Sequence, residues 1–191
     1  MDTVVHRYVA LGDSTTEGLE DPYPGTLEYR GWADRLAERL AAVNPQLRYA
    51  NLAIRGRKLG QIRSEQLAPA IAMKPDLASV VGGVNDVLRP RADVEALADE
   101  LDGMVRALRG AGADVLLMTY PDFGETMFTA RPVRRRLASF NGHIRAIAAA
   151  HRARLMDLDR VGPMDPRLFH PDRLHANPLG HERIALAAAA T

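Results

Sequence analysis

Short apolar runs alternate along the whole chain with longer segments that have helical periodicity. The runs cover residues 4–11, 47–52, 77–82, 114–119 and 154–157. Most of them are apolar at every position, which is typical of strands that are covered on both faces. This alternation predicts an α/β fold in which a parallel sheet lies between two layers of helices.

Three segments between the runs carry apolar residues at helical spacing, and we interpret these stripes as helix faces that pack on the sheet. The stripes are Tyr29, Trp32, Leu36, Leu40 and Val43; then Val94, Leu97, Leu101, Met104, Val105 and Leu108; and finally Val133, Leu137, Phe140, Ile144 and Ile147. Asn177 and Pro178 have the order of an N-cap and first-turn proline, which predicts a last helix.

Length and composition exclude several classes of protein. A chain of 191 residues favours one domain over residues 1–191. Without cysteine, the chain has no disulfide, cysteine-ligated zinc or thiol nucleophile. A net charge of +1 gives no reason to expect a nucleic-acid partner. We see neither a signal peptide nor an apolar run long enough to span a membrane, so the expected localisation is cytoplasmic.

Ser14 follows the first predicted strand within Gly12-Asp13-Ser14. The other three serines fall inside predicted helices (Ser64, Ser139) or a predicted strand (Ser79). Ligands of parallel α/β sheets bind at the carboxyl ends of the strands. The position of Ser14 therefore fits a nucleophile, although a turn or a helix cap is the better explanation of this tripeptide when it is taken alone.

Asp172 and His175 lie three residues apart in the segment before the last predicted helix. A serine hydroxyl needs a base to take its proton, and histidine suits this role near neutral pH. A carboxylate can then fix the histidine tautomer and stabilise the imidazolium. Two further strand exits offer oxyanion donors, namely the side-chain amide of Asn85 and the backbone N–H of Gly56. Together these residues supply the parts needed for acyl transfer.

Taken together, these segments resemble those of the SGNH (GDSL-like) hydrolase family. Four segments are similar to its sequence blocks, in order: Gly12-Asp13-Ser14, residues 51–56, Gly83-Val84-Asn85-Asp86 and Asp172-Arg173-Leu174-His175. The resemblance implies a three-layer sandwich with a five-stranded parallel sheet in flavodoxin-like order. It also implies Ser14 as nucleophile, His175 as base, Asp172 as its partner, and an oxyanion hole of Ser14, Gly56 and Asn85. A small-molecule ester is the implied substrate, and no metal or organic cofactor is expected.

Some positions depart from the family pattern. Thr15 stands where leucine is common, and Ala53 and Arg55 stand where many relatives carry glycine and a small polar residue. Arg55, Arg57 and Lys58 crowd one strand exit, which suits either a solvated charge cluster or an acidic or phosphorylated substrate group.

The sequence excludes some other functions and leaves others open. A Gly-x-Ser-x-Gly elbow and a P-loop are both absent from the sequence. His170, Asp172, His175 and His181 cluster in sequence as zinc ligands do, but Pro171 and Pro178 interrupt their spacing. The alternatives to a hydrolase are an acyltransferase that uses the same acyl-enzyme and a non-catalytic module that binds esters or carbohydrates. The loops 17–28 and 121–132 are expected to shape the pocket.

Overall fold

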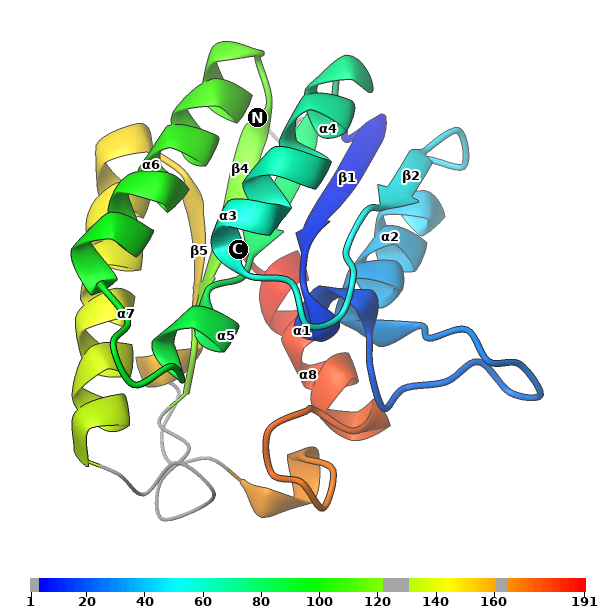
Figure 1. Ribbon diagram of the computed structural model, residues 1–191. Helices are drawn as coiled ribbons and strands as arrows, with labels where there is room; N and C mark the ends of the chain where they lie inside the picture. The colour runs from blue at the N-terminus through cyan, green and yellow to red at the C-terminus, as the bar shows by residue number, and fades with distance from the viewer. Residues whose placement is uncertain (1–3, 122–130, 161–164) are drawn as a thin grey trace.

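The computed structural model describes residues 4–121, 131–160 and 165–191 (Figure 1). Within these ranges a five-stranded sheet has the order β2-β1-β3-β4-β5, and every neighbouring pair of strands is parallel. The strands are β1 (Arg7–Gly12), β2 (Arg48–Asn51), β3 (Leu77–Val81), β4 (Asp114–Thr119) and β5 (Arg154–Asp157). The predicted flavodoxin-like α/β sandwich is confirmed.

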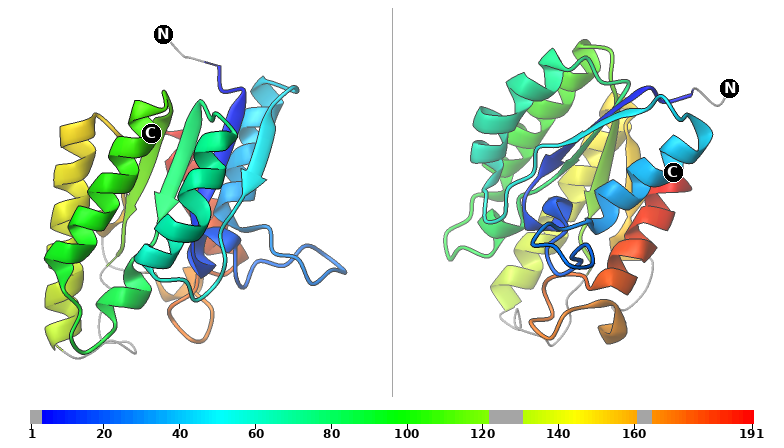
Figure 2. Two further views of the ribbon diagram at one scale, coloured as in Figure 1. Left: turned by 45° about the horizontal axis from the view of Figure 1, so that its top comes forward. Right: turned by 90° about the vertical axis from the view of Figure 1, so that its right-hand side faces the viewer.

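Helices cover both faces of the sheet (Figure 2). One face carries α2 (Gly31–Val43) and α8 (Pro178–Ala189), which pack against each other. The other face carries α6 (Val94–Gly110), α7 (Arg131–His151) and a continuous rod formed by α3 (Leu59–Ile62), the π-helix η1 (Arg63–Leu67) and α4 (Ala68–Ala72). Right-handed crossovers explain this division, because the chain moves from β1 to β2 in one direction and then returns through β3, β4 and β5.

Short helices stand at the carboxyl edge of the sheet, where the predicted site residues lie. They are α1 (Ser14–Glu17), α5 (Val84–Val87), and the 3-10 turns η2 (Leu158–Arg160) and η3 (Pro166–Leu168). None of the helices in the described ranges combines the length and hydropathy that crossing a bilayer requires.

The core confirms most of the predicted stripes. Leu101, Met104, Val105 and Leu108 of α6 are buried, as are Phe140 and Ile144 of α7. The stripe assigned to α2 is wrong at both ends. Tyr29 lies before the helix, in a bridge to Pro22, and Val43, the last helical residue, is 76% exposed. Apolar periodicity identifies the buried face of a helix but does not locate its ends.

Candidate active site

The chain turns sharply between β1 and Ser14. Asp13 caps α1, because its Oδ1 atom accepts a hydrogen bond from the backbone N–H of Thr15 at 3.1 Å. Ser14 is therefore the first residue of a helix, with 9% of its surface exposed. Its backbone N–H belongs to the first turn, where N–H groups have no acceptor within the helix.

Gly12 and Gln66 hold this turn in place. A Cβ atom on Gly12 would stand 2.4 Å from the carbonyl oxygen of Val81, so only glycine fits between β1 and β3. The buried amide of Gln66 accepts from the backbone N–H of Gly12 at 2.8 Å and donates to its carbonyl oxygen at 2.9 Å. Gln66 was not predicted as a site residue, because a glutamine in a helical segment cannot be distinguished from a surface residue by sequence alone.

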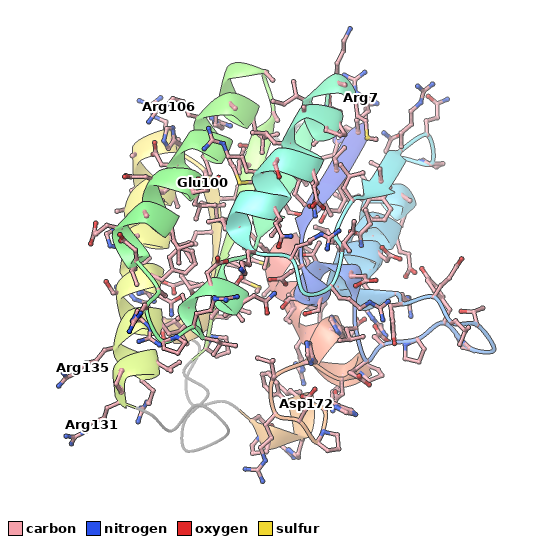
Figure 3. The ribbon with its side chains drawn as sticks, in the orientation of Figure 1. Arg7, Glu100, Arg106, Arg131, Arg135 and Asp172 are labelled. Carbon is pink, nitrogen blue, oxygen red and sulfur yellow. The ribbon has the colours of Figure 1, made fainter. Side chains whose placement is uncertain are left out.

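The structure brings together the three residues that the sequence predicts as a triad. His175 Nε2 lies 3.1 Å from Ser14 Oγ, and His175 Nδ1 lies 2.8 Å from Asp172 Oδ2. With Nδ1 donating to the carboxylate, Nε2 is left to accept the proton of the serine hydroxyl. The loop that carries Asp172 lies at the end of the molecule beside the start of α8 (Figure 3). Ser64, Ser79 and Ser139 lie in η1, β3 and α7, as expected.

The loop before α8 stabilises the charged form of Asp172. Its Oδ1 atom accepts from the backbone N–H groups of Leu174 at 2.9 Å and His175 at 3.0 Å. Partial burial acts to raise the pKa of Asp172, but the His175 ring and these two N–H groups together hold that pKa well below its usual range. Asp172 is therefore ionised at neutral pH.

A second histidine contacts the same carboxylate. His170 Nδ1 lies 3.3 Å from Asp172 Oδ2, and His170 Nε2 lies 3.4 Å from Glu20 Oε2. Glu20 has a positive φ of 73°, a conformation that few residues other than glycine adopt. The link joins the segment after α1 to the loop before α8. Glu20 was not predicted as a site residue, because it lies 150 residues away from His170 in the chain.

Two of the three predicted oxyanion donors are backbone N–H groups, and neither has a protein acceptor in the part of the chain that the structure describes. They are the N–H groups of Ser14 and Gly56. Gly56 has a φ of 76°, and no atom lies within 4 Å of the position that its Cβ would occupy. Both groups thus fit the predicted oxyanion hole in being free to donate.

Asn85 lies beside these residues, but its amide is already engaged. Nδ2 donates to Asp13 Oδ2 at 3.2 Å and to the carbonyl oxygen of Arg57 at 3.0 Å. These two acceptors account for both amide protons. Asn85 therefore joins the exits of β1, β2 and β3, and it can reach a third acceptor only by releasing one of the two.

Asp13 is the buried acid next to Ser14, with 1% of its surface exposed. Burial raises the pKa of Asp13 to about 6, against the opposing effects of the Thr15 N–H and the nearby His175. Above this pKa, near neutral pH, the negatively charged carboxylate of Asp13 lies next to the amide of Asn85.

Salt bridges occupy two of the three basic residues at the exit of β2. Arg55 pairs with Glu17 at 2.6 Å and lies over the ring of Tyr29, while Arg57 pairs with Glu65 at 2.7 Å. These contacts favour the interpretation of the cluster as paired surface charge. They also fix the segment on both sides of Gly56.

The histidines near the carboxyl end serve separate purposes. His181 is buried; its Nδ1 accepts from the backbone N–H of Trp32, and its Nε2 donates to the carbonyl oxygen of Leu19. Burial lowers the pKa of His181, so the neutral ring joins α8 to α2. Across the described ranges, no group of three or more histidine or acidic residues is arranged to hold a metal ion.

Of the two loops expected to shape the pocket, 17–28 and 121–132, residues 122–130 of the second lie outside the described residues.

Comparison with known proteins identifies the family. The GDSL-like Lipase/Acylhydrolase family matches residues 10–183, whereas no curated protein matches the chain. Axe2, an acetylxylan esterase from Geobacillus stearothermophilus, superimposes with a TM-score of 0.75 at 21% identity, over 95% of this chain and 91% of its own. LAE5, an alpha/beta hydrolase enzyme from the metagenome of Lake Arreo, Spain, gives a TM-score of 0.79 at 24% identity, over 97% of this chain and 94% of its own. The family match spans most of the sequence, and the chain belongs to the GDSL-like lipase/acylhydrolase family.

Proposed function

We propose that the chain cleaves carboxylic esters through an acyl-enzyme on Ser14, with His175 as general base and Asp172 as its partner. Ester hydrolysis itself follows from membership of the family. One observation carries the assignment of residues: Ser14 Oγ, the His175 ring and Asp172 Oδ2 form an unbroken chain with separations of 3.1 and 2.8 Å. Both separations are within hydrogen-bond reach, as proton transfer requires.

In the first half of the reaction, Ser14 Oγ attacks the ester carbonyl carbon while His175 Nε2 takes the hydroxyl proton. The resulting imidazolium is stabilised by the ionised Asp172. His175 then gives the proton to the alcohol oxygen as the bond between the carbonyl carbon and that oxygen breaks. The acyl group remains bonded to Ser14.

The oxyanion that forms on the carbonyl oxygen needs donors that are already in place. The free N–H groups of Ser14 and Gly56 support this role. We assign the third donation to Asn85, which exchanges one of its present acceptors for the oxyanion. The 3.2 Å contact with Asp13 is longer than the 3.0 Å contact with Arg57, so the proton that faces Asp13 is the one we expect to move.

In the second half, a water molecule takes the place of the alcohol. His175 removes a proton from the water, the hydroxide attacks the acyl carbon, and the same donors hold the second oxyanion. The proton then returns to Ser14 Oγ as the acid leaves.

The relatives support the assignment of the three residues. Catalytic mutants of the acetylxylan esterase from Geobacillus stearothermophilus replace a serine, a histidine and an aspartate with alanine. In that protein the aspartate precedes the histidine by three positions, which is also the spacing of Asp172 and His175.

Hydrolysis of p-nitrophenyl acetate tests the proposal. Rapid mixing should show a burst of p-nitrophenol equal to the enzyme concentration, or turnover without a burst if acylation is slower. Asp172→Asn should lower kcat by about 10⁴, and Ser14→Ala should abolish the acyl-enzyme. If folded Ser14→Ala protein kept the wild-type rate, Ser14 would not be the nucleophile.

A further inference from the structure

Gln66 is a buried polar residue in an otherwise apolar row. The rod of α3, η1 and α4 contacts β1 (Figure 2), and its buried residues recur at helical spacing: Leu59, Ile62, Gln66 and Ala70. The other three side chains are apolar, as expected for a helix face that packs on a sheet. Burial of an amide at such a position is unfavourable unless its polar atoms form hydrogen bonds. Both polar atoms of Gln66 bond to Gly12.

The end of β1 needs these hydrogen bonds because one of its neighbouring strands stops short. β2 pairs with β1 only as far as Ala10, opposite Asn51, whereas β3 continues to Gly12. Gln66 Oε1 accepts from the Gly12 N–H at 2.8 Å, and Nε2 donates to the Gly12 carbonyl oxygen at 2.9 Å. The side chain of Gln66 thus holds the last residue of β1 as a neighbouring strand would.

The two hydrogen bonds together fix the backbone angles of Gly12. One holds the peptide unit before Gly12 and the other holds the peptide unit after it, so that φ and ψ are both constrained. Glycine is the residue with the greatest conformational freedom, and the close approach of Val81 O leaves no room here for a Cβ atom. The most permissive residue of the chain therefore stands two positions before Ser14, and Gln66 removes its freedom.

We propose that Gln66 is a positioning residue for the reaction and acts through Gly12 to hold Ser14 in its attacking geometry. This role rests on the proposed function. Ser14 Oγ lies 3.1 Å from His175 Nε2, and a displacement of about 1 Å can lower the rate 10²-fold. The Ser14 N–H, a proposed oxyanion donor, belongs to the same residue and moves with it. Because both groups act in the chemical step, loss of the clamp should lower kcat and leave KM unchanged.

The test compares two substitutions of Gln66 in the hydrolysis of p-nitrophenyl acetate. Gln66→Met keeps the length of the side chain but removes both hydrogen bonds, so its kcat should be at least about tenfold below the wild-type value. Gln66→Glu keeps or loses the clamp according to its protonation state. A neutral carboxyl group has an acceptor oxygen and an O–H donor, as the amide has, whereas the ionised group has no donor for the Gly12 carbonyl oxygen.

The pH dependence of Gln66→Glu separates positioning from a merely structural role. Burial favours the neutral carboxyl group, so at pH 5.5 the kcat of this variant should be within about threefold of the wild-type value. Between pH 5.5 and pH 9 the ratio of variant to wild-type kcat should fall at least about tenfold as the carboxyl group ionises. The ratio cancels the titration of His175, which both proteins share. For Gln66→Met the ratio should stay low and constant.

Gln61→Glu and Gln61→Met are the matched controls. Gln61 is exposed on the same rod, and its Oε1 atom accepts from the backbone N–H of Lys58 at the start of α3 instead of from β1. Both control variants should keep the wild-type kcat at every pH. Circular dichroism at each pH shows that the compared proteins are folded.

Two outcomes overturn the inference while leaving the proposed function intact. One is a wild-type kcat in folded Gln66→Met protein, whatever its thermal midpoint. The other is a kcat ratio for Gln66→Glu that does not change with pH, and this outcome decides the question if Gln66→Met fails to fold. Failure of the wild-type protein to hydrolyse the ester, or full activity in Ser14→Ala, would count against the proposed function itself.

Discussion

The Nδ1 atom of His170 lies 3.3 Å from Asp172 Oδ2, the same oxygen that lies 2.8 Å from Nδ1 of His175. One carboxylate therefore contacts two imidazole rings. His170 also reaches Glu20 on the segment that follows α1. The contact makes His170 a candidate positioning residue, which holds the loop that carries Asp172 against the segment that follows Ser14.

Replacing His170 with Gln tests this role. The side chains of His170 and Glu20 are 39% and 33% exposed, and exposed ion pairs contribute about 0.2–1 kcal/mol, so kcat should fall by no more than about fivefold with KM unchanged. Glu20→Gln breaks the same link from its other end, so the double variant should lose no more than either single variant. Additive losses would show that the two residues act separately.

Replacing Asn85 with Ala should lower kcat about 10²–10³-fold with little change in KM, since a donor to the oxyanion acts in the transition state. Steady-state kinetics on an activated ester measures the effect. Because Asn85 also joins Asp13 to Arg57, the thermal midpoint of each variant must be measured alongside. A folded variant with a wild-type kcat would remove Asn85 from the mechanism.

Gly12→Ala should destabilise the fold by about 1–3 kcal/mol, the range for overpacking. The added Cβ would stand 2.4 Å from Val81 O and from Thr16 Oγ1. Gly142→Ala is the control, because Gly142 lies within α7 with no atom within 4 Å of the added Cβ, and this change should stabilise the helix by about 0.5–1 kcal/mol. Urea unfolding measures both, and equal stabilities would contradict the close packing of β1 on β3.

Asp13 should make the protein less stable as pH rises. Burial raises its pKa to about 6, whereas an unfolded chain loses this proton near pH 3.9. Between these values the folded state binds the proton and the unfolded state does not, so the free energy of unfolding falls with rising pH. Because one pKa unit corresponds to about 1.4 kcal/mol, the total is on the order of 3 kcal/mol.

Urea unfolding of wild-type and Asp13→Asn protein from pH 4 to 7 measures this effect. The stability of the wild type relative to the variant should decline across the range and level off above pH 6. Asp99→Asn, which removes an exposed carboxylate, controls for the change in net charge. A difference between wild type and Asp13→Asn that does not vary with pH would contradict the burial of a protonated Asp13.

The sequence predicted the sheet and the residues at its carboxyl edge, because both depend on local patterns. Apolar runs locate strands, and in a parallel sheet the segments after the strands must meet at one edge. The ends of the elements were predicted less accurately. The first strand was expected to begin at residue 4, but β1 begins at Arg7. The first and last residues of β1 are set by its pairing with β2 and β3. The apolar run alone does not contain this information.

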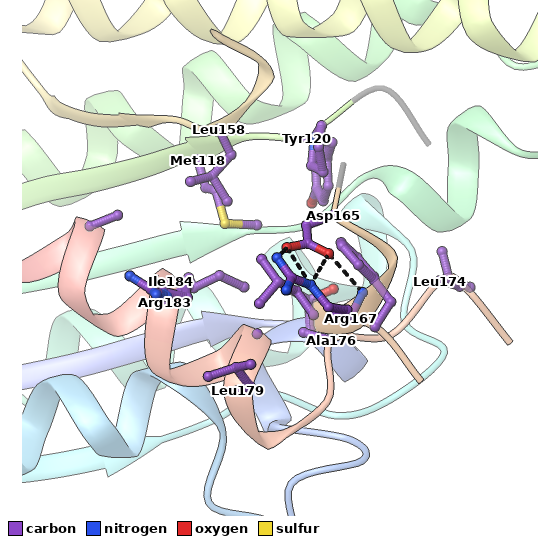
Figure 4. A pocket seen from close by; sticks show the side chains of 16 residues that line it. Met118, Tyr120, Leu158, Asp165, Arg167, Leu174, Ala176, Leu179, Arg183 and Ile184 are labelled. Carbon is purple, nitrogen blue, oxygen red and sulfur yellow. Dashed lines mark hydrogen bonds and ion pairs between the residues drawn. The ribbon is translucent and has the colours of Figure 1, made fainter. Parts of the chain in front are cut away.

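The contacts that hold the site residues in position could not be predicted from the sequence. Asn85 was expected as a donor, but the acceptors that occupy its amide, Asp13 and Arg57, come from two other strand exits. The clamp of Gln66 on Gly12 and the link from Glu20 to His170 likewise join segments far apart in the chain. The cavity between β4 and α8, which Met118 and Ile184 help to line (Figure 4), forms only when α8 packs on the sheet. No single segment of the sequence predicts it.

Covalent labelling of Ser14 tests the central claim most directly. The protein is treated with a fluorophosphonate probe, and the adduct is located by mass spectrometry of peptides. The account predicts a single adduct on Ser14 that is strongly reduced in His175→Ala, because the hydroxyl then lacks the base that lies 3.1 Å away. An adduct on another residue, or none on folded wild-type protein, would contradict the account.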